Sequence, residues 1–445
     1  TDVWFGEAIR YIERQVERQD EQPFFCLITP NAPHVPHIAP ERFIQPYREL
    51  AEADPTAATF FGYPESDQML KFYGMISCID ENVGLLRARL EELGLAQNTI
   101  FIFMTDNGSA GGLGLDREGF VVHGYNAGMR GKKGSPYEGG HRVPFFLHWP
   151  AGGLDQAKDV SHVTANVDVL PTLLNLCGVD DPASARAHGR SLVSLLRGQE
   201  DTWPDRAIVT DSQRLVQPVK WRQSCVLRGA WRLINGRLLY NLAYDPEQRH
   251  DVADSHPDIV TQLRTDYEAW WEIVSQQFAE EIPIVIGDGA TMLTAHDWRN
   301  RTDPEQTFGP EQPGDNVRCA WNQTQIRQGL EYSGYWEIDV RRAGRYRFEL
   351  RRWPREADLP LRDGIPGEHK PYTDAIADGY GGGRALSIEQ ARIRIGKREA
   401  ERWIEAGDTA ATFDLTLEHG PAHLETSFTA EGLQLSAYYI YIESI

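Results

Sequence analysis

Two oxygen-bearing side chains, Asp106 and Asn107, follow closely on the apolar run of residues 99–103. Such a run predicts a buried strand, so both side chains are expected where that strand ends. A carboxylate and an amide supply only oxygen ligands, which suit Ca²⁺ or Mg²⁺ better than zinc or copper. The pair therefore predicts part of a hard-metal site, although Asp-Asn-Gly after a strand is also typical of a capped turn.

A lysine, Lys133, lies in a loop rich in small residues, Arg130-Gly-Lys-Lys-Gly-Ser-Pro-Tyr-Glu-Gly-Gly-His-Arg-Val-Pro144. Beside a dication, a compact ammonium can balance negative charge on a transferring anionic group and donate a hydrogen bond to the departing oxygen. The alternative is an ordinary solvated lysine. We expect the neighbouring Lys132 to be exposed.

Three histidines complete the set of side chains that could do chemistry. His34 and His37 lie in Asn31-Ala-Pro-His-Val-Pro-His37, and His123 lies in the segment 119–125, between the metal pair and the lysine. An imidazole can act as a general acid near neutral pH, and its alternative role is to bond a loop carbonyl. His123 is a candidate for lining a substrate pocket.

The elements that must position these side chains follow from the apolar pattern. Residues 24–28 form a continuous apolar run, which predicts a strand buried on both faces. Residues 69–93 carry apolar side chains at helical spacing, and Gly94 is expected to end that helix. The next strand is predicted at 99–104, and the run 143–149 is expected to add a neighbouring strand.

Strand, crossover helix and strand make a βαβ unit, in which the carboxyl ends of both parallel strands lie at one edge of the sheet. Ligand sites in open α/β sheets lie at that edge. We therefore expect His34 and Asp106 to converge.

Together these segments resemble the type I sulfatases of the alkaline phosphatase superfamily. The resemblance extends from Thr1 to about residue 275 and includes the late segment Leu239-Tyr-Asn-Leu-Ala-Tyr-Asp-Pro-Glu247. It implies that Asp106 and Asn107 form half of a calcium site. It also implies that Lys133 contacts the sulfate and the leaving oxygen, and that His34 contacts the sulfate and is a candidate general acid.

One family feature is missing from the sequence. Sulfatases attack sulfur with the hydrate of a formylglycine made from Cys or Ser in the pattern C/S-x-P/A-x-R, and no Cys or Ser here stands in that pattern. The family's paired N-terminal aspartates are missing too. Because the chain opens at Thr1 inside a helical pattern, we expect the nucleophile on an N-terminal segment not included here, and this chain alone to be inactive. The alternative is a degenerate protein.

The predicted fold class is α/β, with a mostly parallel sheet flanked by helices. Residues 1–205 are expected to form an N-terminally incomplete catalytic domain like that of alkaline phosphatases and sulfatases. Residues 206–280 predict a small subdomain of an antiparallel sheet plus a helix. Residues 281–445 alternate with period two between turns, which predicts a β-sandwich accessory domain.

Bulk properties exclude some classes of partner. The formal net charge of −20 disfavours nucleic acid, and there is no apolar run of membrane-spanning length. The five cysteines lack C-x-x-C spacing and are expected to be mostly buried small hydrophobes. The oligomeric state and the compartment stay open, although the resemblance favours a periplasmic or secreted protein.

The expected function is a sulfuric ester hydrolase acting on a sulfated small molecule or glycan, with the ester on a carbohydrate or aryl group. A phosphodiesterase or phosphonate hydrolase of the same superfamily is one alternative. Another is an inactive carbohydrate-binding protein that uses aromatic side chains of the last domain as a sugar platform. The candidates for that platform, which a sandwich core would use equally, are Trp298, Trp321, Tyr332, Trp336 and Trp353.

Overall fold

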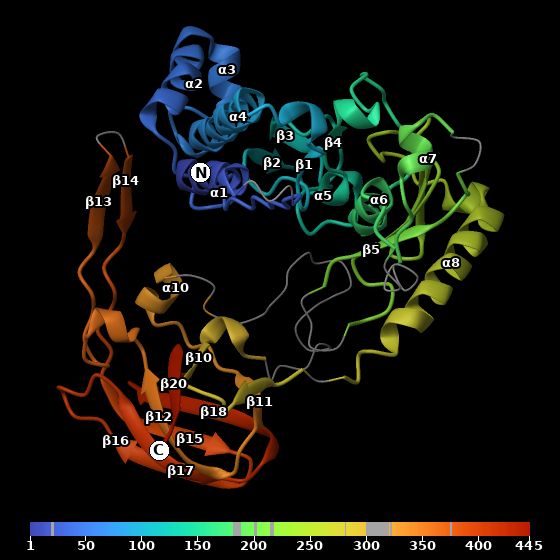
Figure 1. Cartoon of the computed structure of the whole chain (residues 1–445). Coiled ribbons are helices and arrows are strands. Elements are labelled where there is room, and N and C mark those ends of the chain that lie inside the picture. The colour runs from blue at the N-terminus through green and yellow to red at the C-terminus, as the bar shows by residue number, and fades with distance from the viewer. Residues whose placement is uncertain are drawn as a thin grey trace. The chain divides into compact units, whose positions relative to one another are not determined.

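The chain divides into two compact units (Figure 1), and the candidate catalytic and metal-binding residues all lie in the first. Unit 1 comprises residues 1–212 and 220–273, and unit 2 comprises 213–219 and 274–445. The computed structural model describes residues 1–18, 22–180, 188–199, 203–213, 218–280, 282–299, 320, 323–373 and 376–445.

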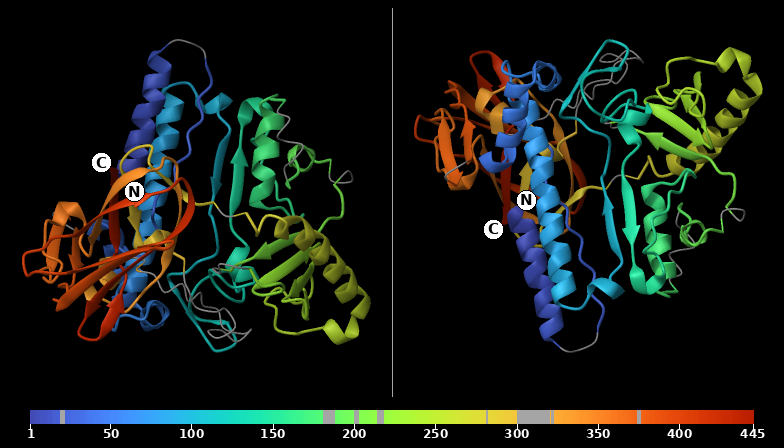
Figure 2. Two further views of the ribbon diagram at one scale, coloured as in Figure 1. Left: turned by 90° about the horizontal axis from the view of Figure 1, so that it is seen from below. Right: turned by 90° about the horizontal axis from the view of Figure 1, so that it is seen from above.

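Unit 1 contains the following helices, of which the first and the fourth pack on one another. The helices are α1 (Asp2–Glu17), α2 (Glu41–Ala53), α3 (Pro55–Phe61), α4 (Gln68–Glu92), α5 (Glu138–His141), α6 (Val169–Leu176), α7 (Val193–Leu196) and α8 (Pro257–Ser275). Helices α1 and α4 lie side by side in both views of Figure 2, because Phe5 and Ile12 pack against Leu86 and Leu90. Phe101 of the strand that precedes Asp106 packs against the same residues, so this apolar seam joins the long helix to that strand.

The long helix confirms the periodic pattern read from the sequence. It spans Gln68–Glu92 against the predicted 69–93. Gly94 adopts a left-handed φ of +71°, and its amide donates to Glu91 O over 3.0 Å. Glycine accepts this backbone conformation without steric cost, so the helix ends there.

The sheet next to the candidate site differs from the prediction. Strand β1 (Phe101–Met104) pairs with β4 (Phe145–His148), and the pairing is antiparallel. Strands β2 (Leu113–Leu115) and β3 (Val121–Gly124) form a separate antiparallel hairpin. The predicted mostly parallel sheet is therefore wrong for the described residues of unit 1, whereas the mixed α/β content holds.

Residues 24–28 are not a strand, which is why the parallel arrangement fails. Phe24 and Ile28 pack on the α1–α4 seam, whereas Phe25 and Leu27 are 72% and 74% exposed. The alternation of burial has the period of a strand, but no described strand pairs with this segment. A strand forms only where a neighbouring strand completes its hydrogen bonds, and the sequence of a single segment does not show whether such a neighbour exists.

A small antiparallel sheet and helix α8 complete unit 1. The strands run in the order β5 (Ile208–Asp211), β6 (Ser224–Arg228), β7 (Trp231–Ile234) and β8 (Leu238–Asn241). Val226 and Leu233 of the sheet form one core with Leu263 and Tyr267 of α8. The sheet and the helix therefore share one apolar core.

Unit 2 contains two larger sheets around one apolar core. Its elements are β9 (Ile284–Ile286), β10 (Thr291–Thr294), α10 (Gln323–Gln328), β11 (Tyr335–Val340), β12 (Gly344–Arg351), β13 (Glu368–Thr373), β14 (Ile376–Tyr380), β15 (Ile388–Ile395), β16 (Arg398–Trp403), β17 (Ala411–Leu417), β18 (Gly420–Ala430), β19 (Leu433–Leu435) and β20 (Tyr439–Ser444). One sheet has the order β10-β20-β12-β17, and the other has the order β16-β15-β18-β11-β9, with β19 pairing β18. Phe348 and Ile440 of the first sheet share a core with Ile393 and Phe428 of the second.

The described aromatic side chains that were candidates for a sugar platform pack in this core. Trp298, Trp336 and Trp353 are 4%, 0% and 1% exposed, so they cannot present a sugar platform to solvent. Tyr332 packs against the same core, and Trp321 lies outside the described residues.

Two remaining sequence expectations concern cysteines and membranes. The described cysteines are free, and they comprise buried Cys78 and Cys225, partly buried Cys26 and exposed Cys177. Cys319 lies outside the described residues.

Across the described stretches, no helix combines the length and the apolar character that crossing a bilayer demands.

Candidate active site

Two backbone hydrogen bonds join the loop of Asp106 and Asn107 to the loop of Lys133. The amide of Lys133 donates to Ser109 O over 3.1 Å, and the amide of Gly108 donates to Gly140 O over 3.0 Å. These bonds hold the segment after β1 against the lysine loop. The structure therefore joins two of the three predicted segments by direct backbone hydrogen bonds.

Glycines make this close approach possible. A Cβ added at Gly108 would lie 1.8 Å from Gly139 O of the lysine loop, so the two loops can meet there only because that side chain is absent. Within the lysine loop, a Cβ added at Gly140 would lie 2.0 Å from Ser135 O, so this loop too can fold tightly only with glycine.

The side chains that were predicted to bind metal lie at this junction. Asp106 is exposed and Asn107 is partly buried. Their oxygens are of the type that Ca²⁺ prefers, but Ca²⁺ takes about six to eight oxygen ligands. Among the described residues, no cluster of three or more His, Cys, Asp or Glu side chains could hold a metal ion. The donor set thus fits calcium in kind and supplies only part of its coordination shell.

Lys133 is partly buried within its loop, whereas Lys132 is exposed as expected. Ser135 donates its amide to Lys132 O over 2.8 Å, which closes a tight turn around Lys133. The turn, together with the bond to Ser109, fixes the backbone from which the ammonium extends.

His34 lies in an exposed turn closed by its own amide, which donates to Asn31 O over 2.9 Å. Its Nδ1 lies 2.8 Å from Val35 O, the loop-carbonyl bond that the sequence left as the alternative role. Because a carbonyl oxygen only accepts, Nδ1 is the donor in this bond, and Nε2 points away from Val35. The hydrogen bond therefore fixes the orientation of the His34 ring. It does not show whether the ring also acts as a general acid.

His37, the second histidine of the Asn31–His37 segment, is the histidine that packs on the Asp106 loop. A Cβ added at Gly111 would lie 2.6 Å from His37 Nε2, and the His37 ring meets Phe72 edge-on at 5.6 Å between centroids. Burial lowers the pKa of His37, although an interaction with the Gln68 side chain opposes this effect. The packing of His37 thus fixes the Ala-Pro-His loop to the metal loop.

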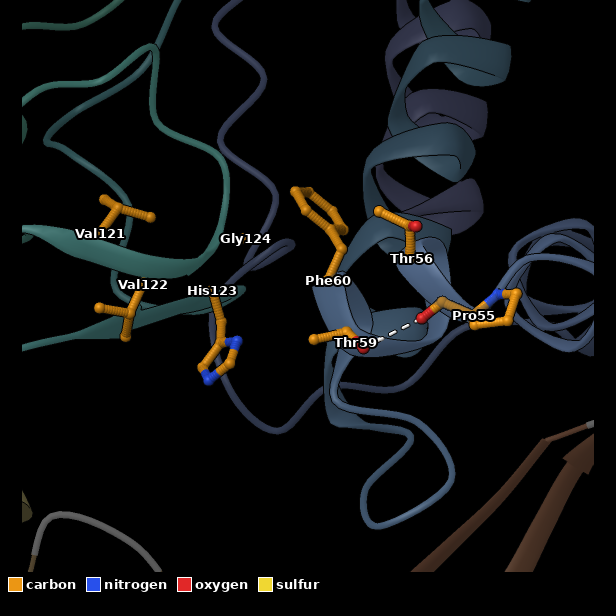
Figure 3. A pocket seen from close by; sticks show the side chains of 8 residues that line it. All are labelled: Pro55, Thr56, Thr59, Phe60, Val121, Val122, His123 and Gly124. Atoms are coloured by element: carbon orange, nitrogen blue, oxygen red, sulfur yellow. Dashed lines mark hydrogen bonds between the residues drawn. The ribbon is translucent and has the colours of Figure 1, made fainter.

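His123 is exposed on β3, opposite Gly114 of β2. It lines a cavity of about 540 Å³ with residues of α3 (Figure 3). The turn between β2 and β3 is bonded to the lysine loop, because Gly131 donates its amide to Gly119 O over 2.8 Å. His123 therefore sits beside the candidate site rather than within the Asp106–Lys133 junction.

A buried carboxylate fixes the end of the lysine loop. Glu138, at the start of α5, is 1% exposed, and Arg232 Nε of β7 donates to it over 2.6 Å. His141 Nε2 lies 3.1 Å from the same oxygen. Burial raises the pKa of Glu138, but the hydrogen bond of His141 and the charge of Arg232 outweigh burial and lower it to about 2.

The start of the lysine loop is fixed in the same way. The guanidinium of Arg130 donates to Gln248 O over 2.9 Å and to the Tyr240 hydroxyl over 3.2 Å. It also lies 4.1 Å from the centroid of the Tyr137 ring. Gln248 Oε1 in turn accepts from the Glu138 amide over 2.9 Å. Both ends of the loop are therefore held by the small sheet and the segment that follows it.

Sequence reasoning missed these supporting residues for a physical reason. Glu138 is part of the quoted loop motif, but nothing local pairs it with Arg232.

Comparisons with known proteins agree with the motif reading. Residues 1–179 match the family model described as Sulfatase, and residues 132–269 match the model described as N-sulphoglucosamine sulphohydrolase, C-terminal. An arylsulfatase of Clostridium perfringens is 28% identical over 222 residues, which cover 45% of this chain and 42% of the relative. The steryl-sulfatase of Mus musculus is 36% identical over 143 residues, which cover 32% of this chain and 23% of the relative.

The chain spans less than half the length of these curated relatives. Among solved structures, that of Ps i-CgsB is 24% identical with a TM-score of 0.49, and the match covers 60% of this chain and 54% of that one.

Proposed function

Because residues 1–269 belong to the type I sulfatase family, we propose that this chain carries part of the active site of a sulfuric ester hydrolase. The observation that carries the proposal is the pair of backbone bonds between the Asp106–Ser109 loop and the lysine loop. These bonds join the backbones of the two loops, which supports a shared site in which the oxygen ligands of one loop and the ammonium of the other bind one sulfate group.

Lys133 would bind a sulfate oxygen and stabilise the negative charge that grows on the ester oxygen as it leaves. His34 would act as an imidazolium: Nδ1–H donates to Val35 O, and Nε2–H supplies the proton that the leaving oxygen receives. As the nucleophile bonds to sulfur, the bond between sulfur and the ester oxygen breaks, and the proton of His34 completes the leaving alcohol. Asp106 and Asn107 would hold Ca²⁺, or Mg²⁺ with the same ligand preference, and the ion would supply positive charge beside the sulfate.

The nucleophile is proposed to come from outside residues 1–445. A formylglycine hydrate would supply the attacking oxygen, and no Cys or Ser of this chain stands in the C/S-x-P/A-x-R pattern that yields it. We therefore expect this chain by itself to bind sulfate esters without turning them over.

The substrate class is proposed from the relatives. The matched models and proteins bear names of enzymes for sulfated glucosamine, aryl sulfates and steryl sulfates. We favour a sulfated carbohydrate or aryl ester, handled by a periplasmic or secreted protein. Residues 206–280 would support the catalytic domain of residues 1–205, and residues 281–445 would be a β-sandwich accessory domain.

Isothermal titration calorimetry with p-nitrophenyl sulfate tests the proposal on the chain itself. Replacing Lys133 by alanine should weaken binding at least about tenfold, because a charge-assisted hydrogen bond is lost. The matched control is Lys132→Ala, one residue away and exposed. Equal affinities for the two variants would remove Lys133 from the site, and a preference for p-nitrophenyl phosphate would favour a phosphoesterase.

A further inference from the structure

An open surface hollow of about 540 Å³, called the cavity below, lies between α3 and the β2–β3 hairpin. Figure 3 shows Phe60, Thr56 and Thr59 projecting from α3 on one side, and His123 and Val122 projecting from β3 on the other. The eight lining residues are Pro55, Thr56, Thr59, Phe60, Val121, Val122, His123 and Gly124. None of them is an acid, a lysine or an arginine.

One wall of the cavity is a fixed aromatic ring. The ring of Phe60 packs against Phe61 at 5.0 Å and Tyr73 at 6.1 Å between centroids. Tyr73 itself meets Phe72, the ring that supports His37. Phe60 is thus held from behind by an aromatic cluster and needs no reordering to receive a flat apolar surface.

The other lining side chains can form hydrogen bonds, and those on α3 are uncharged. The hydroxyl of Thr59 donates to Pro55 O over 3.0 Å, so its oxygen is left to accept from a ligand. Thr56 adds a second hydroxyl on α3, and His123 lines the cavity from the hairpin. An aromatic wall opposite neutral donors and acceptors matches a ring that has apolar C–H faces and hydroxyl edges.

The cavity is built on the segment that connects the two candidate catalytic loops. Gly112 precedes β2, and a Cβ there would lie 2.4 Å from the Phe72 ring. The turn of the hairpin is bonded to the lysine loop through Gly131 and Gly119. A ligand in the cavity would therefore lie on the same small substructure as Lys133.

We propose that this cavity is a subsite for an uncharged pyranose ring, the part of a sulfated glycan that carries or adjoins the ester. The proposal rests on the proposed sulfatase function and names its substrate class. Phe60 stacks on the apolar face of the sugar, and Thr56, Thr59 and His123 bind its hydroxyl groups. The sulfate is left to the cationic loop.

Saturation-transfer NMR on the whole chain tests the subsite with two probes, methyl α-D-glucopyranoside and its 6-O-sulfate. Phe60→Ala should weaken binding of the neutral glucoside about tenfold, as expected for the loss of one stacked ring. His123→Ala should weaken it several-fold, and this variant keeps the test valid if Phe60→Ala fails to fold. The matched controls are Phe146→Ala and His148→Ala, which alter exposed side chains of β4 outside the cavity.

The outcomes separate the two proposals. The subsite is overturned if the neutral glucoside does not bind the wild-type chain, or if it binds both cavity variants as tightly as the controls. Loss of only the sulfated probe in Lys133→Ala supports the sulfatase proposal independently. If Lys133→Ala leaves the sulfated probe unaffected while Phe60→Ala weakens both probes, the sulfatase proposal fails and the sugar subsite stands.

Discussion

The carboxylate of Glu138 lies 2.6 Å from the Nε of Arg232, although the two residues are 94 positions apart in the sequence. Their side chains are 2% and 8% exposed, so this ion pair is almost completely shielded from solvent. It joins the helix that ends the lysine loop to strand β7 of the small sheet. The position of Lys133 therefore depends on a subdomain that contributes none of the proposed catalytic residues.

Replacing Glu138 by glutamine should lower the free energy of unfolding by about 3 kcal/mol, because it leaves the charge of Arg232 buried without its counter-ion. Urea denaturation at pH 7 measures the change. The matched control is Glu92→Gln, whose side chain is 64% exposed and paired with Arg89. Exposed pairs contribute at most about 1 kcal/mol, so a Glu138→Gln variant as stable as this control would contradict the prediction.

The same pair predicts a pH dependence. The pKa of Glu138 is lowered from 4.5 to about 2 in the folded protein, so the folded state favours the carboxylate. The stabilisation is fully present above about pH 4.5 and is lost as the pH falls towards 2. The stability difference between the wild type and Glu138→Gln should therefore shrink between pH 5 and about pH 3. A difference that stays constant over this range would exclude titration of Glu138 as its source.

Local patterns predicted those elements that need no partner to form. The apolar periodicity of α4 and the left-handed Gly94 lie within one stretch of chain, and the structure confirms both. Residues 24–28 have an equally strong apolar pattern, but they lack a described neighbouring strand and form no ladder. The sequence therefore identified an apolar surface there and misassigned the structure that it forms.

In the candidate site, too, the sequence predicted the local motifs and missed the contacts between distant segments. The loops of Asp106 and Lys133 were recognised as motifs, and their glycines explain how they meet. The partners of Glu138 and Arg130 come from distant segments with no local signature. The packing of His37 on Gly111 was also invisible, because it depends on where the Asp106 loop turns.

The contact between the two catalytic loops can be tested at Gly108. A Cβ added there would lie 1.8 Å from Gly139 O, so Gly108→Ala must separate the loops. We expect a lower melting temperature and at least about tenfold weaker binding of p-nitrophenyl sulfate, since Lys133 is displaced from the oxygen ligands. The control is Gly84→Ala in α4, where an added Cβ meets nothing within 4 Å and alanine favours the helix. Unchanged sulfate binding by Gly108→Ala would show that the contact between the loops does not matter for the site.

Calcium binding by the isolated chain tests the metal assignment without any turnover. Asp106 and Asn107 provide two of the oxygen ligands that Ca²⁺ needs, so weak binding is expected, with a Kd on the order of 1 mM. Asp106→Asn removes the only formal charge of the pair and should weaken binding at least about tenfold in a calorimetric titration. Asn107→Asp should strengthen it, because a second carboxylate adds charge to the same cluster. Asp155→Asn, an exposed position away from the loop, is the matched control. If Ca²⁺ bound Asp106→Asn and Asp155→Asn equally, the ion would occupy another place, and the turn-forming role of Asp-Asn-Gly would be sufficient to explain the sequence.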